Sequence, residues 1–221
     1  MYKKLAQLQE KIRGLPLWVC GLNSLIDRHR QVEQEFHDLL RTLLPGGTSL
    51  IYQPGTLKNL GRIWTKALVE EAGQLHNIDD IIRGAFTADN FKDLKQIDEL
   101  LEDFAKTYNI TYERRDKFAK EPEKTGVFRS IMYKFDFGNH IQAEVQLNIK
   151  AFADIYPESH NNYETIRELE RKSELSSDEK NQYENAAARN QELHRAAWQS
   201  VRAEYAAIYG KSPAAAGTPD N

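Results

Sequence analysis

Hydrophobic positions in the first 44 residues recur at intervals of three and four, which predicts helix. The stretch Gly14-Leu15-Pro16 interrupts this pattern, so we expect two helices there. Residues 45–55 are rich in proline and glycine and predict a loop with a short strand at 49–52. The helical period then returns over residues 56–73.

Beyond residue 80 the pattern alternates between strand and helix. Residues 81–88 form a buried apolar run, 90–108 an amphipathic helix and 109–114 a second strand, which gives the order β, α, β. A basic loop over 115–126 precedes a hairpin over 127–148 that turns near 136–139. Two helices and a tail expected to be disordered complete the pattern, at 152–172, 177–209 and 211–221.

This pattern predicts an α+β fold in which helices flank a mixed sheet of about five strands. At 221 residues the chain suits one sizeable core with helical extensions at both ends. We expect an N-terminal helical extension, an α/β core, a C-terminal helix and the tail, at 1–48, 49–172, 173–210 and 211–221.

The segment FGNHIQAEVQLN, residues 137–148, places an acid on a polar face. Ile141, Val145 and Leu147 point to one side of the strand, whereas Glu144 and Gln146 point to the other. Facing strands bury their apolar residues on the same side, so the second face of the hairpin joins an aromatic, a hydroxyl, a cation, an acid and amides. Such a face is either solvated or part of a cleft.

A row of cations lies upstream. Lys58, Arg62 and Lys66 stand at i, i+4 and i+8 and form one stripe on the helix predicted over 56–73. No acid at i+4 spacing neutralises them, so a bound polyphosphate would relieve their repulsion. Asp80 stands directly before the strand at 81–88, where a carboxylate beside phosphates commonly holds Mg²⁺.

Composition narrows the class of protein. Hydrophobic residues make up 40% of the chain and charged residues 29%, with a net charge of −3, which disfavours broad nonspecific binding to nucleic acid. No apolar run approaches the roughly 18 residues that cross a bilayer, and the amino terminus lacks a secretory signal. We therefore expect a cytoplasmic protein without a membrane partner, in its own cell or in a target cell if it is a delivered toxin.

The order of these motifs over residues 50–172 resembles the synthetase domain of the RelA/SpoT family, the (p)ppGpp pyrophosphokinases. The resemblance implies a nucleotidyltransferase-like sheet. It also implies that Lys58 and Lys66 bind the phosphates of the donor ATP, with Arg62 between them where the family has serine. Arg83 resembles the arginine that flanks the adenine of ATP, and Asp80 matches the aspartate that holds magnesium.

The second half of the motif set concerns the acceptor. Phe128 stands where a family tyrosine stacks on the acceptor base, and Met132 replaces the usual histidine. The Glu-x-Gln strand makes Glu144 the group that activates the acceptor hydroxyl and a second ligand of Mg²⁺, with Gln146 as its neighbour at the acceptor. The resemblance implies contacts to the acceptor phosphates from a basic loop, at Arg115, Lys117 and Lys124.

The activity implied is Mg²⁺-dependent transfer of the β,γ-pyrophosphate of ATP to the 3′-hydroxyl of a purine nucleotide. The chain looks similar to small alarmone synthetases, or to toxin relatives that make an adenosine alarmone or modify the 3′ end of transfer RNA. ATP and a purine nucleotide are the expected partners; transfer RNA, an antitoxin or immunity protein and a second copy of the chain are further candidates.

Two other classes stay open. ADP-ribosyl transfer requires an arginine, a hydroxyl-bearing strand and an acidic strand. Residues of these types are present at Arg129, Ser130 and Glu144. The departures from the family motifs at several positions would also suit an inactive module that binds a nucleotide or a partner protein. The histidine set of the family's hydrolase half is missing, since His37-Asp38 is the one pair of that type.

Overall fold

The computed structural model describes residues 2–14, 22–55, 63, 65, 80–118, 129–138 and 141–210. In chain order its elements are α1 (Tyr2–Arg13), α2 (Leu22–Arg41), β1 (Ile51–Pro54), β2 (Ile82–Ala88), α4 (Phe91–Thr107), β3 (Thr111–Asp116), β4 (Ile131–Asp136), β5 (Gln142–Ile149), α5 (Lys150–Glu170) and α6 (Ser177–Tyr209). The helix predicted over 56–73 lies outside the described residues except for Ile63 and Thr65, which are both helical.

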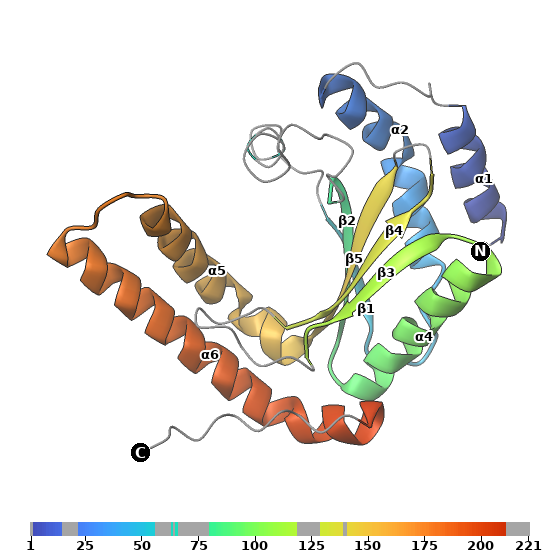
Figure 1. The fold of residues 1–221 in the computed structure, drawn as a ribbon. Helices are drawn as coiled ribbons and strands as arrows, with labels where there is room; N and C mark the ends of the chain where they lie inside the picture. Colours follow the sequence, from blue (N-terminus) through green and yellow to red (C-terminus); the bar gives the residue numbers. More distant parts are fainter. Residues whose placement is uncertain are drawn as a thin grey trace.

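The strands form one five-stranded sheet in the order β1-β2-β5-β4-β3 (Figure 1). Strands β2 and β5 run parallel, and the other three pairs are antiparallel. Helix α4 makes the crossover between β2 and β3. The predicted α+β class and mixed sheet are therefore confirmed.

The hairpin of β4 and β5 has the register that the apolar alternation predicts. Tyr133 lies opposite Val145, and Met132 lies opposite Gln146. The connection turns through Gly138, whose φ of 79° suits a residue without a Cβ. Each strand thus sends its apolar residues to one face of the sheet and its polar residues to the other.

Helices α2 and α4 pack against the apolar face, which we call the covered face. Helix α4 begins at the cap of Asn90, whose side chain accepts a hydrogen bond from the backbone N–H of Asp93 at 2.8 Å. Residues at helical spacing then enter the core beneath the sheet. The buried set from α4 is Phe91, Leu94, Ile97, Leu101 and Phe104, and it meets Phe86, Tyr133, Val145 and Leu147 of the strands.

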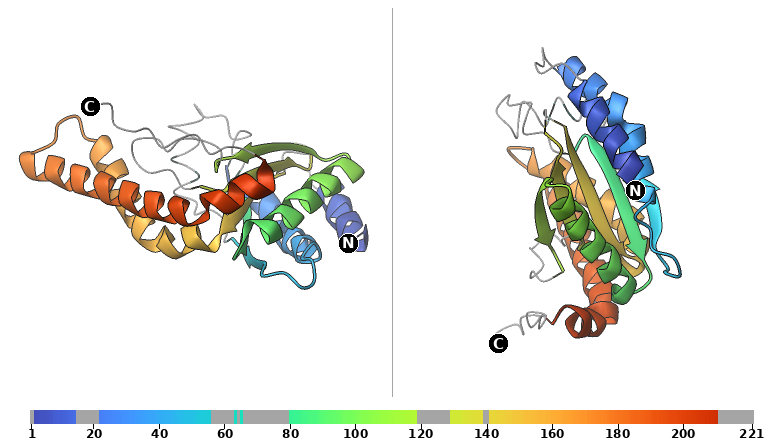
Figure 2. Two further views of the ribbon diagram at one scale, coloured as in Figure 1. Left: turned by 90° about the horizontal axis from the view of Figure 1, so that it is seen from below. Right: turned by 90° about the vertical axis from the view of Figure 1, so that its right-hand side faces the viewer.

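Helices α5 and α6 form a long hairpin that projects away from the sheet (Figure 1). Helix α6 opens with a capping box between Ser176 and Glu179 and closes at Gly210 with a φ of 64°. Its last turns return to the body beside α4 (Figure 2). The ring of Tyr205 there lies 5.2 Å from that of Phe91 on α4. Only one end of the hairpin is therefore built into the core.

Several boundaries differ by about two residues from the sequence expectation, since β1 spans Ile51–Pro54, β3 Thr111–Asp116 and α5 Lys150–Glu170. Residues 115 and 116 belong to strand β3, because Arg115 pairs with Met132 and Asp116 with Ile131 across the sheet. The predicted basic loop thus begins later, and its residues 119–126 lie outside the described part of the chain. None of the described helices has the length and apolar character that crossing a membrane requires.

Candidate active site

The face of the sheet opposite α2 and α4 is polar, and we call it the open face. On β5 it carries Glu144 and Gln146, and the neighbouring strands place Arg83 of β2 and Lys134 of β4 level with Glu144. Two cations therefore flank the position of the predicted base along the sheet. This arrangement follows directly from the strand register.

Glu144 is largely shielded from solvent, with 8% of its surface exposed. Its Oε1 accepts a hydrogen bond of 2.7 Å from Nε2 of Gln146, two residues along the same strand. Because side chains two apart on a strand lie on the same face, the Glu-x-Gln spacing itself creates this contact. The amide thus orients the carboxylate on the open face.

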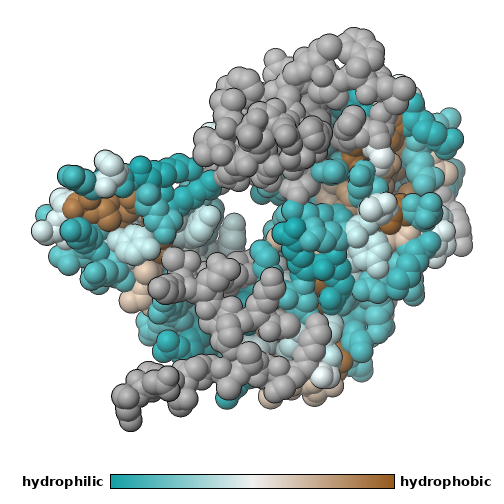
Figure 3. All heavy atoms as spheres, in the orientation of Figure 1, coloured by the Kyte–Doolittle hydropathy of each residue, from teal (hydrophilic) through white to brown (hydrophobic). Residues whose placement is uncertain are grey.

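A cleft of about 940 Å³ lies over part of this face. Strands β1, β2 and β5 supply one wall, helix α5 supplies the other, and Lys117 enters just after β3. In the space-filling view the molecule is hollowed between the α5–α6 hairpin and the sheet (Figure 3). The polar lining includes Gln53, Arg83, Thr87, Lys117, Gln146, Asn148, Lys150 and Asp154.

Three of the predicted site residues line this cleft, namely Arg83, Lys117 and Gln146. Glu144 joins them through its hydrogen bond to Gln146 but does not itself belong to the described lining. The chain leaves the described part of this cleft at Gly55, whose N–H donates to the carbonyl of Arg83 at 2.8 Å. Arg83 and Gln146 are 63 positions apart in the sequence, and the sheet brings them to the same cleft.

Two of the remaining predicted site residues, Asp80 and Arg115, are described and lie outside the cleft lining. Asp80 lies two residues before β2, outside the lining of the cleft. Arg115 stands on β3, where its guanidinium pairs with Glu113 of the same strand, with Nη2 at 2.8 Å from Oε2. The other candidates lie outside the described residues, and they are Lys58, Arg62, Lys66, Lys124 and Phe128.

Magnesium needs few protein ligands. Among the described residues no group of three or more His, Cys, Asp and Glu side chains has the arrangement of a metal site. Mg²⁺ is commonly bound by one or two carboxylates together with substrate phosphates. Asp80 and Glu144 fit that chemistry, because both side chains are carboxylates. Glu144 lies on β5, and Asp80 lies just before β2, the parallel neighbour of β5.

The arginine of the ADP-ribosyl alternative has a packing role. Arg129 is buried, and its Nη1 donates to the carbonyl of Phe118 at 2.8 Å. Its guanidinium lies 4.5 Å from the ring centre of Trp198 on α6, a cation–π distance. This side chain therefore ties the start of β4 to the hairpin, and it is not part of the described cleft lining.

Helix α5 contributes groups that the motif comparison did not assign. Tyr156, His160 and Tyr163 line the cleft. The family motifs assigned a role to none of these three side chains, and the two tyrosines were missed. Their spacing of four and three, directly after the Glu-x-Gln strand, was the available signal.

A buried polar network holds α5 against α6 behind this wall of the cleft. Oγ of Ser159 lies 2.8 Å from Nε2 of His194, and Nδ2 of Asn190 donates to the carbonyl of Ser159 at 3.2 Å. Burial, assisted by the nearby Arg129, lowers the pKa of His194 to about 4. The imidazole is consequently neutral at neutral pH, as its place inside the hairpin requires.

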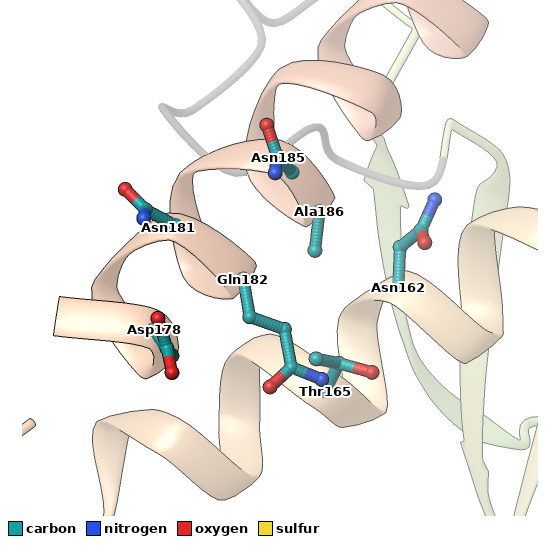
Figure 4. Close-up of a pocket in the computed structure, with 7 residues that line it drawn as sticks. All are labelled: Asn162, Thr165, Asp178, Asn181, Gln182, Asn185 and Ala186. Carbon is teal, nitrogen blue, oxygen red and sulfur yellow. The ribbon is translucent and has the colours of Figure 1, made fainter. Parts of the chain in front are cut away.

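A second hollow, of about 500 Å³, lies between the outer parts of α5 and α6 (Figure 4). Amide and hydroxyl side chains dominate it, and Gln182 of α6 reaches toward Thr165 of α5. Among the described residues that line it there is one acid, Asp178, and no Lys, Arg or His. It therefore lacks the cations that distinguish the cleft over the sheet.

Comparisons with known proteins define the fold. No family model and no curated protein sequence matches the chain. Among solved structures, small alarmone synthetase 1 from Bacillus subtilis is similar at 16% identity and a TM-score of 0.56, covering 82% of this chain and 92% of that one. The same protein bound to its product pppGpp gives 18% identity and a TM-score of 0.57, with coverage of 82% and 92%.

A third structure is the complex between the Type VI effector Tas1 and its immunity protein. It matches at 14% identity and a TM-score of 0.53, and covers 81% of this chain and 97% of that one. The chain thus has the fold of the small alarmone synthetases, and the predicted RelA/SpoT-like synthetase fold is confirmed. At these identities the likeness concerns the fold.

Proposed function

We propose that the chain is a pyrophosphokinase that transfers the β,γ-pyrophosphate of ATP to the 3′-hydroxyl of a purine nucleotide. The observation that carries the proposal is the Glu144–Gln146 pair on the open face, beside a cleft that Arg83 and Lys117 also line. The fold supports it, because structures with this fold include an alarmone synthetase bound to its product. The proposal also uses the three cations Lys58, Arg62 and Lys66, which lie outside the described residues.

In this reaction the acceptor 3′-oxygen attacks the β-phosphorus of ATP. The bond between the β-phosphorus and the α,β-bridging oxygen breaks, AMP leaves, and Glu144 takes the hydroxyl proton. Positioning and neutralisation of charge supply most of the catalysis in such transfers. Lys58 and Lys66 would hold the donor phosphates, with Arg62 between them, and Arg83 would flank the adenine.

The acceptor side has its own groups in this scheme. Lys117, with Arg115 and Lys124, would contact the acceptor phosphates, while Phe128 would stack on the base and Gln146 would orient Glu144. Asp80 and Glu144 would hold Mg²⁺, which when bound neutralises phosphate charge. We assign the acceptor only to the class of purine nucleotides, with the 3′ end of transfer RNA as the other candidate.

The test is a transfer assay with γ-labelled ATP and Mg²⁺. The purified chain is incubated with GDP, GTP, ADP, AMP or deacylated transfer RNA in separate reactions, and the products are separated by chromatography. We expect label on one purine acceptor and release of one AMP per transfer. Consumption of NAD⁺ in a separate incubation with NAD⁺ would support ADP-ribosyl transfer, and nucleotide binding without AMP release would identify an inactive module.

A matched control separates this chemistry from contaminating kinases. A kinase releases ADP from ATP, whereas pyrophosphate transfer releases AMP. The protein carrying Glu144→Gln, prepared in the same way, should bind nucleotides and release AMP at least about 10²-fold more slowly. Equal AMP release from both proteins would contradict the role of Glu144 and point to a contaminant.

A further inference from the structure

Three aromatic side chains form a continuous stack on α5, and we call them the aromatic strip. The ring centres of Tyr156 and His160 lie 5.2 Å apart, those of His160 and Tyr163 lie 6.5 Å apart, and both interplanar angles are 23°. Tyr156 is 46% exposed and Tyr163 is 45% exposed. The strip is thus ordered by its own stacking although much of its surface meets solvent.

Exposed rings of this kind call for an explanation. The largest fully buried side chains include Tyr133, Tyr205 and several phenylalanines, which lie in the body of the protein. Burial of aromatic surface is favourable, and contiguous exposed rings, unlike single ones, are a feature of binding surfaces. The strip lines the same cleft as Gln146 and Arg83. It therefore faces the place where substrate is proposed to bind.

The strip is held in a fixed position from behind. Ser159, next to His160 in sequence, contacts His194 through its hydroxyl and Asn190 through its carbonyl. Asn162, next to Tyr163, donates a hydrogen bond of 3.1 Å to Asn190. A surface that is already ordered loses little conformational entropy when a flat ligand stacks on it.

The position of the strip favours the acceptor over the donor. Arg83, the proposed neighbour of the ATP adenine, lies on β2 beside the chain that leads into residues 56–73. Helix α5 instead continues directly from β5, which carries Glu144, Gln146 and Asn148. The acceptor hydroxyl has to reach Glu144, so the base of the acceptor belongs on the side of β5 and α5.

We propose that the aromatic strip of α5 is a platform on which the purine base of the acceptor stacks, in addition to the contact that the proposed function gives to Phe128. This inference rests on the proposed function and adds a determinant of acceptor affinity. Stacking favours the larger purine surface over a pyrimidine and tolerates either purine. Lys117 in the same cleft supplies a cation for the acceptor phosphates.

The experiment compares binding and turnover in matched variants. Tyr156→Ala/Tyr163→Ala removes the two phenolic rings, Tyr156→Phe/Tyr163→Phe keeps them, and Tyr183→Ala removes a tyrosine of α6 outside the described cleft lining. Calorimetry measures the Kd of GDP, ADP, UDP and a non-hydrolysable ATP analogue. The transfer assay measures KM for the best acceptor at saturating ATP.

We expect the double alanine variant to weaken acceptor binding and raise its KM by about 10-fold or more, because loss of base stacking commonly has that cost. The Kd of the ATP analogue should change less than about twofold, within the usual effect of surface substitutions. The double phenylalanine variant and Tyr183→Ala should both resemble the wild type. UDP should bind more weakly than either purine diphosphate.

The results distinguish the two proposals. If the wild type transfers pyrophosphate and the double alanine variant keeps its acceptor Kd and KM, the aromatic strip is not the platform, while the proposed function stands. Equal weakening of acceptor and ATP analogue, or failure of the phenylalanine variant, would overturn the platform in favour of a structural role. If the wild type binds no purine nucleotide and releases no AMP, the proposed function fails and the platform fails with it.

Discussion

The carboxylates on the two faces of the sheet have different hydrogen-bond partners. On the covered face the carboxylate of Asp98 accepts hydrogen bonds from Nε and Nη2 of Arg114 at 2.9 and 2.7 Å and one from the hydroxyl of Tyr133. On the open face Glu144 accepts a hydrogen bond from the neutral amide of Gln146, beside a cleft. The first carboxylate is paired with a cation of the protein, whereas the second accepts a hydrogen bond from a neutral amide whose residue lines the cleft.

This comparison separates stability from chemistry. A buried ion pair leaves a costly unpaired charge when one partner is removed. A shielded carboxylate beside a cleft is suited to exchange a proton with a substrate. We therefore expect substitutions on the covered face to lower the free energy of unfolding, and substitutions on the open face to lower turnover.

The largest expected effect is on the open face. Glu144→Gln keeps the shape of the side chain and removes the proposed base, so we expect kcat to fall by about 10² to 10⁴. The melting temperature should stay close to that of the wild type. Glu113→Gln is the matched control, because Glu113 lies across Lys134 from Glu144 and pairs with Arg115 on the sheet edge. A collapse of the fold in Glu144→Gln would show that this acid is structural.

On the covered face, Asp98→Asn removes the charge that balances Arg114. We expect the free energy of unfolding to fall by about 3 kcal/mol, since one partner of a largely buried ion pair is lost. Urea denaturation measures this change. The control is Glu102→Gln, whose Oε1 lies 3.6 Å from Nε of Arg114 in a more solvated position. Similar losses in the two variants would contradict the distinction between them.

The pH dependence of the free energy of unfolding tests whether His194, which lies behind the α5 wall of the cleft, is kept neutral. The pKa of His194 is about 4 in the folded protein, below about 6.5 for an unfolded chain. The unfolded chain therefore binds more protons between these values, so stability falls as the pH is lowered through that window. We expect about 2 kcal/mol of loss from this group between about pH 7 and 5.

The measurement is urea unfolding of the wild type and His194→Gln at both pH values. The variant should show the smaller change with pH, because it lacks the group that takes up the proton. An identical pH dependence in both proteins would mean that His194 is not kept neutral by its surroundings.

The smallest effect is expected away from both faces. Ser176→Ala removes the cap that accepts the N–H of Glu179 at 3.3 Å, at the tip of the α5–α6 hairpin. We expect a loss of about 1 kcal/mol in the free energy of unfolding with unchanged kcat. Ser177→Ala, one residue later, should have little effect on either quantity. A large fall in kcat in Ser176→Ala would show that the tip of the hairpin takes part in function.

Much of the fold was predictable because its signals are local. The alternation in residues 141–147 set the register with β4, and helical spacing identified α4 before its partners were known. The end of β3 was not predictable in this way. Arg115 and Asp116 are polar and resemble loop residues, and only their pairing with Met132 and Ile131 makes them strand.

The candidate site was predicted in part for the same reason. The Glu-x-Gln spacing produced its contact within one strand, so the sequence sufficed to predict it. The sequence indicated that Arg83, Lys117 and Gln146 have the right chemistry, but their common cleft depends on strand order across the sheet. The tyrosines of the aromatic strip were missed, because a tyrosine at helical spacing fits a buried face equally well.

The sequence by itself determined which faces of the strands are apolar, where the capped helices α4 and α6 begin, and that an acid and an amide lie side by side on β5. The tertiary structure alone decided which polar face remains open, since helices α2 and α4 cover one side of the sheet and α5 stands beyond the other. The physical reason is the separation along the chain over which each interaction acts. Alternation, capping and spacing act over a few residues, whereas a cleft exists only after distant segments have packed.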